Sequence, residues 1–443
     1  MSAPPLLLTE KLIQSLRTLC AQPSSVGQLD DLHVTADLLA RMLHGLGMEV
    51  RLYADGPPVL IGRRDGRTGH TLLLYHRFDA PPTGPWLAWS HEPYQLGERE
   101  GALYGRGVAE GKGPLAAHLQ AIQAFIHAEG ELPCGVVIVI DGGGLLGSPS
   151  LPAALAAHSD MLAADACLGS TGERDAAGNP LCYSGTKGLL QVRLSVRGPT
   201  HPLSAGVAPS MRNPLWRLTW ALASIKGEDE DISIPGFYDH VDGPTRDENI
   251  ALRAIKLNEK GRLAAWGADG FLFGMSGVAL VRAEVSLPTC NLSSLHCEPE
   301  HELAQLPSLA TAVLDFQLVP HQDPDNIATL LRAHLDDRGF TDVVFERLPG
   351  GYPPARTHPD SLFVRQVAAA GAEVFGSLLP VVSAGPFALP LQLFAARLDC
   401  PVASVGMTMP DSSTYGPDEH IPLDDLCRHG QLLIELLLAL GGE

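Results

Sequence analysis

The chain has 443 residues, enough for two or three domains with their own cores, and its 45% apolar and 18% charged residues are typical of a globular protein. Lys and Arg number 31 against 50 Asp and Glu, so the formal net charge is −19. Such a surface repels phosphate groups, and neither nucleic acid nor a membrane surface is expected as a partner.

The cysteines and the N-terminal segment indicate the compartment. The eight cysteines form no C-x-x-C pair, so they are interpreted as small apolar residues in a reducing environment. The first residues lack a basic start followed by a cleavage site, which predicts no signal peptide. No apolar run approaches the ~20 residues that a membrane-spanning helix needs. We therefore expect a soluble cytoplasmic protein.

The first part of the chain alternates helical and buried-strand patterns. Apolar residues at helical spacing predict helices, and short continuous apolar runs predict buried strands. The expected helices cover Leu6–Cys20, Leu32–Leu46 and Lys112–Ala128, and the expected strands cover Val50–Tyr53, Val59–Ile61, Thr71–Tyr75, Val136–Ile140 and Asp165–Leu168. Strands alternating with helices indicate an α/β layer with a mainly parallel sheet.

The middle of the chain has a different pattern. Leu189–Val196 and Ala310–Val319 alternate apolar and polar residues, as half-exposed antiparallel strands do. Helices are expected over Pro214–Ile225 and Pro324–Arg338. This combination predicts a smaller α+β domain.

After Pro353 the α/β pattern returns. It predicts helices over Ser361–Val374, Leu389–Leu398 and Leu423–Leu440 and strands over Pro380–Val382 and Pro401–Val405. The expected fold class is α/β, with a mainly parallel sheet covered by helices on both faces and an inserted α+β domain. The predicted domains are 1–185 and 351–443 for the α/β domain and 186–350 for the insertion.

Five segments, taken in order, carry a family resemblance. They are LLLYHRFDAPP (72–82), ALYGRGVAEGKGP (102–114), VVIVIDGGGLLGSPSL (136–151), IPGFYDHV (234–241) and YGPDEHIPLDDL (415–426). Together they resemble the M20 family of metallopeptidases, especially its carnosinase-like and PepV-like dipeptidases. The resemblance implies a catalytic α/β domain, an inserted lid and dimerisation domain, and hydrolysis of peptide or acyl-amide bonds with two zinc-like ions and a glutamate base.

The first two metal-binding signatures of the family match this sequence imperfectly. In YHRFDA the family's Asp falls on Asp79, its metal-binding His on Arg77 and its Gly on His76. A guanidinium has no lone pair to donate and repels a dication. Use of His76 instead would need a one-residue shift that turns its side chain to the opposite face of the strand. The family's bridging Asp falls on Glu110.

The remaining positions that the resemblance implies lack metal ligands. The general base falls on Gly144 and the next metal ligand on Leu145. The carboxylate ligand after the third strand falls on Thr171, and the last His falls on Tyr415. With Glu110 as the one competent ligand, we predict no bound metal and no other cofactor.

The substrate side of the resemblance also departs from the family. The family's lid His falls on Ser204, three residues after His201, and its lid Arg falls on Gln317. Asn213 and Pro214 match the family's Asn-Pro. The residues predicted to line a ligand site are His76, Arg77, Thr171, His201, Asn213 and Tyr415, with Asp79 and Glu110 as candidate catalytic groups.

Structural roles compete with these assignments. Asp79 is expected to form an ion pair with Arg77 or His76, and Glu110 with Lys112 is expected to make a salt bridge or cap at a helix start. Most other histidines, including His118 and His429, are interpreted as surface or core residues because they show no metal-binding spacing.

Three functional hypotheses follow. The favoured one is a pseudoenzyme that binds a small peptide-like or amino-acid-like ligand, or a protein partner, without binuclear hydrolysis, and pairs into a homodimer through the lid. In it, Arg77 would receive an anionic group of the ligand directly. The second is an enzyme with metal-independent chemistry on an amide or amino-acid derivative. The third is a conventional metal-dependent dipeptidase or deacylase whose ligands are misaligned here.

Overall fold

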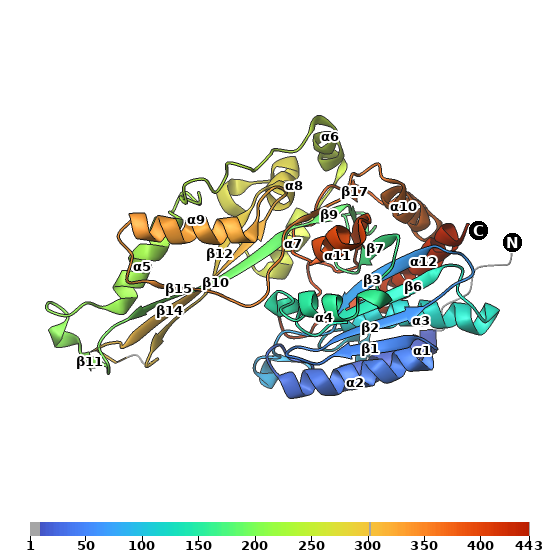
Figure 1. Cartoon of the computed structure of the whole chain (residues 1–443), viewed down its shortest axis with the longest axis horizontal. Helices are drawn as coiled ribbons and strands as arrows, with labels where there is room; N and C mark the ends of the chain where they lie inside the picture. The colour runs from blue at the N-terminus through green and yellow to red at the C-terminus, as the bar shows by residue number, and fades with distance from the viewer. Residues whose placement is uncertain (1–8, 301–302, 443) are drawn as a thin grey trace. The chain divides into compact units, whose positions relative to one another are not determined.

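The chain forms two compact units in a computed structural model that describes residues 9–300 and 303–442 (Figure 1). Unit 1 comprises residues 1–186, 244–286 and 355–443, and unit 2 comprises residues 187–243 and 287–354. The unit limits near 186 and 354 lie close to the limits expected from sequence. The segment 244–286, expected in the insertion, differs from that expectation because it clusters with unit 1.

The segment 244–286 joins unit 1 through a small apolar cluster. Leu252, Ile255, Val281 and Val285 pack with Tyr183 and its neighbours on two short strands of the large sheet. Its helices are short, at eight to ten residues each, and were not predicted from the sequence.

Unit 1 is built on a mixed eight-stranded sheet. The strand order is β1-β2-β6-β3-β7-β18-β8-β17, and the four central strands β6, β3, β7 and β18 are parallel neighbours. These strands are β1 (Glu49–Tyr53), β2 (Val59–Arg64), β3 (Thr71–Arg77), β6 (Gly135–Asp141), β7 (Ala166–Gly169), β8 (Cys182–Tyr183), β17 (Val381–Val382) and β18 (Val402–Val405).

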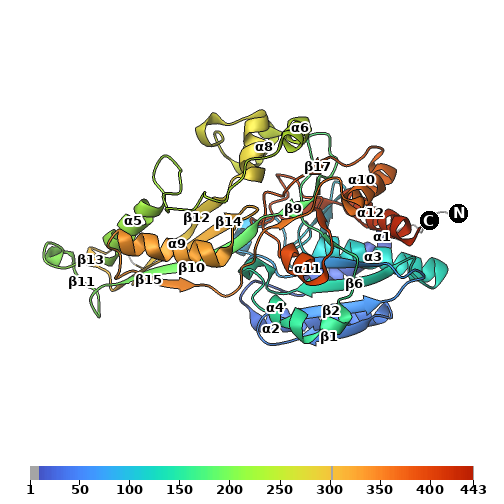
Figure 2. The same ribbon diagram turned by 45° about the horizontal axis from the view of Figure 1, so that its top comes forward.

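Helices cover both faces of this sheet (Figures 1 and 2). The α-helices of unit 1 are α1 (Thr9–Ala21), α2 (Leu29–Gly45), α3 (Lys112–Glu129), α4 (Leu151–Ala157), α6 (Arg246–Ala254), α7 (Glu259–Trp266), α8 (Gly277–Ser286), α10 (Leu362–Phe375), α11 (Leu391–Leu398) and α12 (Leu423–Gly441). Short 3₁₀ turns are η1 (Trp86–Ala88), η2 (Gly144–Leu146), η3 (Ser159–Met161) and η5 (Leu272–Gly274). Two smaller sheets are β4 (Gly97–Arg99), β5 (Ala102–Tyr104) and β19 (His420–Pro422), and β9 (Gly185–Thr186) with β16 (Ala355–Arg356).

Strand β6 illustrates why these apolar runs become central strands. All seven of its residues are buried. Val136, Ile138 and Ile140 face the core formed with α1, α2, α3, α10 and α12, whereas Val137 and Val139 face the core formed with α4 and α11. Because both faces of the strand lie against helices, alternation is not needed and every position is apolar. The predicted mainly parallel sheet is confirmed.

Unit 2 is an antiparallel sheet with helices on one face. Its strands, in the order β12-β14-β10-β15, are β12 (Thr289–Glu298), β14 (Leu309–Leu318), β10 (Gly188–Arg197) and β15 (Val344–Arg347). The other elements are β11 (Leu203–Ser204), η4 (Ala205–Val207), α5 (Pro214–Ile225), β13 (Gln305–Leu306) and α9 (Pro324–Asp337). The inward residues of β10 and β14 pack against α5 and α9, as the alternating pattern predicts.

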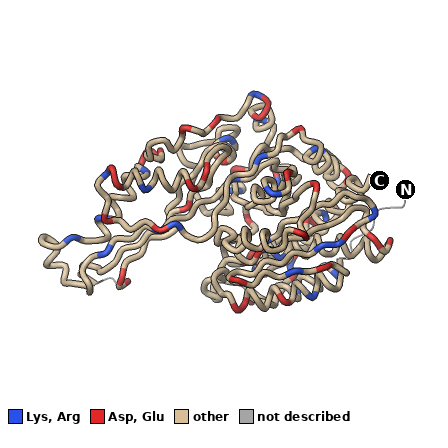
Figure 3. The backbone as a smooth tube through the Cα atoms, in the orientation of Figure 1, with Lys and Arg blue, Asp and Glu red and all other residues tan. Residues whose placement is uncertain are grey.

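Several expected element limits shift by only a few residues. The helix expected from Leu6 is described from Thr9, and residues 6–8 lie outside the described part of the chain. Among residues 9–300 and 303–442, no helix combines the length and apolar character that crossing a bilayer requires. The eight cysteines are all free, and six of them are buried. Acidic and basic residues are dispersed along both units (Figure 3).

Candidate functional site

The carboxyl end of β3 places two charged side chains inside unit 1. Arg77 ends the strand with 8% exposure, and Asp79 follows two residues later with none. Ligand sites in open α/β sheets lie at the carboxyl ends of parallel strands, because loops and helix starts meet there. The same location therefore holds the candidate site here.

Both terminal nitrogens of Arg77 contact neighbouring acceptors. Its Nη2 atom lies 2.7 Å from Glu110 Oε1, and its Nη1 atom donates to the backbone oxygen of Asp79 at 3.3 Å. Nη1 also lies 4.0 Å from Asp79 Oδ1. Burial alone would lower the pKa of Arg77, but the charges of Glu110, Tyr415 and Asp79 raise it above its ordinary value. The guanidinium thus stays charged and is neutralised from within the protein.

The two oxygens of the Asp79 carboxyl group have different surroundings. Its Oδ2 atom accepts a hydrogen bond from the Leu145 N–H at 2.7 Å. Its Oδ1 atom has no hydrogen-bond partner among the described residues. Burial raises the pKa of Asp79 to about 7, although the Arg77 charge opposes that rise. The neutral form of Asp79 is therefore favoured more than that of an exposed aspartate.

Gly144 and Arg77 share the same space. A Cβ atom on Gly144 would lie 2.9 Å from Arg77 Cβ and 3.0 Å from Arg77 Cδ. Both contacts involve the aliphatic stem of Arg77, which cannot swing away without breaking its ion pair with Glu110. The absence of a side chain at residue 144 is therefore coupled to the presence of arginine at residue 77.

Glu419 anchors the loop that carries Glu110. Its carboxylate accepts hydrogen bonds from the backbone N–H groups of Gly107 at 2.7 Å, Ala109 at 3.0 Å and Glu110 at 3.3 Å, and from Arg106 Nη1 at 3.1 Å. Glu419 and Arg106 are each 1% exposed. Burial raises the pKa of Glu419 to about 7, against the lowering effects of these donors. No role was predicted for Glu419 from the sequence. The one feature that could have pointed to it is its position as an acidic residue just after the YGP turn.

Thr171 and Tyr415 contribute less directly. The Thr171 backbone donates to Ser404 Oγ at 3.3 Å and accepts from it at 2.6 Å, which fixes the turn after β7. Tyr415 is 71% exposed and contributes to the electrostatic environment of Arg77. Both predicted positions thus belong to the same unit as Arg77.

His76 lies among other histidines instead of beside Glu110. Its Nε2 atom lies 3.0 Å from His118 Nδ1 on α3, and its Nδ1 atom lies 2.9 Å from Ser170 Oγ. The His118 ring in turn stacks on His429 of α12, with ring centroids 4.5 Å apart. All three imidazoles are 1% exposed, and burial lowers the pKa of each. This cluster is a buried core feature.

Substitution of His429 by Leu is expected to make the protein less sensitive to acid. Neither ring nitrogen of His429 has a hydrogen-bond partner in the described part of the chain. Burial lowers its pKa to about 4, whereas an unfolded histidine protonates near 6.5, so the unfolded state binds more protons below pH 6.5. Wild type should therefore lose about 2 kcal/mol relative to His429→Leu between pH 7 and pH 5. Urea unfolding at both pH values measures this difference.

A matched control for this prediction is His358→Leu, since His358 is exposed. This variant removes an imidazole that is not buried, and its loss of stability between pH 7 and pH 5 should match that of wild type. If His429→Leu showed the same pH dependence as wild type, the depressed pKa of His429 would be wrong.

The two predicted site residues of unit 2 have local partners. His201 Nδ1 lies 3.2 Å from Thr200 Oγ1. Asn213 is the N-cap of α5, where its side-chain oxygen accepts from the N–H groups of Leu215 at 2.8 Å and Trp216 at 3.4 Å. The amide oxygen of Asn213 is thus used to start a helix.

The donors at the end of β3 do not fit a pair of divalent ions. Glu110 faces a guanidinium, Gly144 offers no donor, and Leu145 offers only an apolar side chain. Within residues 9–300 and 303–442, no group of three or more His, Cys, Asp or Glu side chains is arranged to hold a metal ion.

The architecture, an α/β unit interrupted by an antiparallel α+β unit, is the one that the sequence resemblance implies. The profile of Peptidase family M20/M25/M40 matches residues 73–439. The chain belongs to this family.

Comparison with known proteins places dipeptidases among its relatives. The chain is 26% identical to human Beta-Ala-His dipeptidase over 69% of its own length and 62% of the relative's. It is 24% identical to the Cys-Gly metallodipeptidase dug1 of Schizosaccharomyces pombe over 63% of its own length and 60% of the relative's. These alignments span about three fifths of the curated relatives.

Solved structures match over a greater length. An M20 family metallo-carboxypeptidase, Sso-CP2 of Sulfolobus solfataricus, superposes with a TM-score of 0.89 at 26% identity, covering 98% of this chain and 100% of that one. Human carnosine dipeptidase 1 superposes with a TM-score of 0.87 at 21% identity, covering 98% and 97%. The second likeness concerns the fold alone.

Proposed function

We propose that this chain is an M20-fold protein that binds a small peptide-like or amino-acid-like ligand, or a protein partner, without binuclear-metal hydrolysis. The observation that carries the proposal is the Arg77–Glu110 ion pair, 2.7 Å long, at the end of β3. A permanent positive charge there competes with any dication for the same carboxylate. Gly144 supports it, because its Cβ position is blocked by Arg77.

The pairing also modifies the expected role of Arg77. Its charge is already met by Glu110 and Asp79, so an anionic ligand would have to exchange with Glu110. We therefore infer that a ligand carboxylate approaches from the side of Tyr415, which is exposed. Pairing of two copies through unit 2 remains a prediction of the family resemblance.

A conventional metal-dependent dipeptidase is the second candidate. The family membership and the names of the relatives, a Beta-Ala-His dipeptidase and a Cys-Gly metallodipeptidase, favour it. It requires that residues other than those aligned here bind the ions. A metal-independent amidohydrolase is the third, and the Asp79 carboxyl group with its pKa of about 7 favours it.

Metal content measured together with turnover distinguishes the three. We expect protein purified without chelator and incubated with zinc or manganese to hold far less than one ion per chain by elemental analysis. We expect no hydrolysis of a dipeptide and acyl-amino-acid panel, and a rise in melting temperature with at least one panel member. Two equivalents of metal with chelator-sensitive hydrolysis would instead establish the dipeptidase.

Glu110→Gln provides the matched variant. If Glu110 ligates metal, this change lowers both metal content and turnover. Under our proposal both quantities are already near zero in the wild type, so the change leaves them unaltered. Hydrolysis that survives chelation but is lost in Asp79→Asn would establish the metal-independent enzyme.

A further inference from the structure

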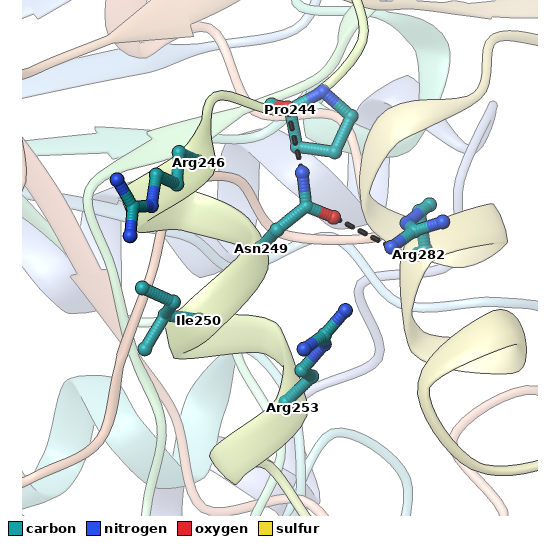
Figure 4. A pocket seen from close by; sticks show the side chains of 6 residues that line it. All are labelled: Pro244, Arg246, Asn249, Ile250, Arg253 and Arg282. Carbon is teal, nitrogen blue, oxygen red and sulfur yellow. Dashed lines mark hydrogen bonds between the residues drawn. The ribbon is translucent and has the colours of Figure 1, made fainter.

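A second charged site lies in unit 1, between α6 and α8. A cavity of about 570 Å³ is lined by Pro244, Arg246, Asn249, Ile250, Arg253 and Arg282 (Figure 4). Arg246, Asn249 and Arg253 stand at positions i, i+3 and i+7 of α6 and so share one helical face. The lining includes three guanidinium groups and no carboxylate.

These arginines lack the carboxylate partners that some other arginines of the chain have, such as Arg77 and Arg106. Among residues 9–300 and 303–442, Arg246, Arg253 and Arg282 form no ion pair, although acids outnumber bases by 50 to 31. By contrast, Arg262 of the neighbouring α7 pairs with Glu173 and Glu284. Three positive charges around one cavity repel one another, and an anion bound between them would offset this electrostatic repulsion.

Asn249 fixes one of the arginines in place. Its Nδ2 atom donates to the carbonyl oxygens of Pro244 at 2.8 Å and Thr245 at 2.9 Å, which sets the direction of the amide. Its Oδ1 atom accepts from Arg282 Nη2 at 2.6 Å (Figure 4). Arg282 is thereby positioned while its other N–H donors remain available. An oriented guanidinium loses less freedom when it binds an anion.

The start of α6 is occupied by its own cap. Thr245 Oγ1 accepts from the Glu248 N–H at 3.3 Å, and Glu248 Oε2 accepts from the Thr245 N–H at 2.8 Å. The other Glu248 oxygen lies 2.6 Å from Arg356, so this acid is turned away from the three arginines. Anion affinity in the cavity therefore comes from side chains and not from the free end of the helix.

We propose that this cavity binds a small molecule with two or more anionic oxygen groups, either phosphates or carboxylates. Guanidinium groups match both oxyanions with paired hydrogen bonds, and Ile250 offers an apolar surface for the carbon skeleton. A neighbouring cavity of about 750 Å³ is different, because Asp247, Glu248 and Asp360 line it together with Arg356 and Arg365. This inference is independent of the proposed function at β3.

Calorimetric titration of the full-length chain with pyrophosphate and with citrate at low salt tests the site. We expect at least one of them to bind, with an affinity that falls as salt rises. Binding of pyrophosphate alone identifies phosphates as the ligand class, and binding of citrate alone identifies carboxylates. Failure of both at millimolar concentration overturns the proposal.

Variants locate the binding. Arg253→Ala and Arg282→Ala should each weaken binding about tenfold or more, since each removes charge-assisted hydrogen bonds. Asn249→Asp places a carboxylate beside Arg282 and should abolish binding. Arg365→Ala, in the neighbouring cavity, is the matched control and should bind as wild type does. All of these side chains except Asn249 are exposed, so the variants should fold. Unchanged binding in Arg253→Ala and Arg282→Ala would overturn the proposal.

Discussion

Glu419→Ala should lower the free energy of unfolding of unit 1 by about 4 kcal/mol. The substitution leaves the guanidinium of Arg106 buried without its carboxylate. It also removes the acceptor of the N–H groups of Gly107, Ala109 and Glu110. Unpaired buried charges and donors carry the full cost of their lost hydration. Urea unfolding followed by tryptophan fluorescence measures the effect, because Arg106 lies over the Trp89 ring at 4.8 Å.

Glu98→Ala is the matched control. Glu98 belongs to the small sheet that also contains β19, and it is exposed. Its removal should change the free energy of unfolding by less than about 0.5 kcal/mol. A loss below about 1 kcal/mol in Glu419→Ala would contradict the anchoring role of Glu419.

Arg77→Met should lower the free energy of unfolding by about 3 kcal/mol. Glu110 loses its partner and Asp79 loses the nearby positive charge that lowers its pKa. Methionine keeps much of the aliphatic stem, so the loss reports on charge more than on packing. Chemical unfolding at pH 7 measures it.

A double-mutant cycle separates the pair from its surroundings. Arg77→Met combined with Glu110→Gln removes both charges and should recover at least half of the stability lost in Arg77→Met. Additive losses in the double variant would mean that the two side chains do not interact.

The regular elements of unit 1 were predictable because their apolar patterns are strong. The runs over Thr71–Tyr75 and Val136–Ile140 became β3 and β6 almost residue for residue. Strand β12 was missed because most of its residues are exposed, so it shows no alternation. Helix α6 was missed although Thr245 and Glu248 form a capping box, since its apolar face is short.

The site could be predicted only where partners are close in sequence. Local spacing suggested that Glu110 would pair with Lys112, but Lys112 Nζ donates to the Gln22 carbonyl at 2.7 Å and Glu110 pairs with Arg77. The expected contact of Asp79 with Arg77 is present at 4.0 Å. Ion pairs between residues that are far apart in sequence depend on the order of the strands in the sheet. That order cannot be deduced from any one segment.

The position of β18 has a consequence for biosynthesis. This strand lies between β7, which ends at Gly169, and β8, yet it begins at Val402. A ribosome needs roughly ten seconds or more to synthesise the intervening stretch. During that time the nascent sheet presents the unpaired edge of β7, and a chaperone or early docked helices must shield it until residues 402–405 emerge.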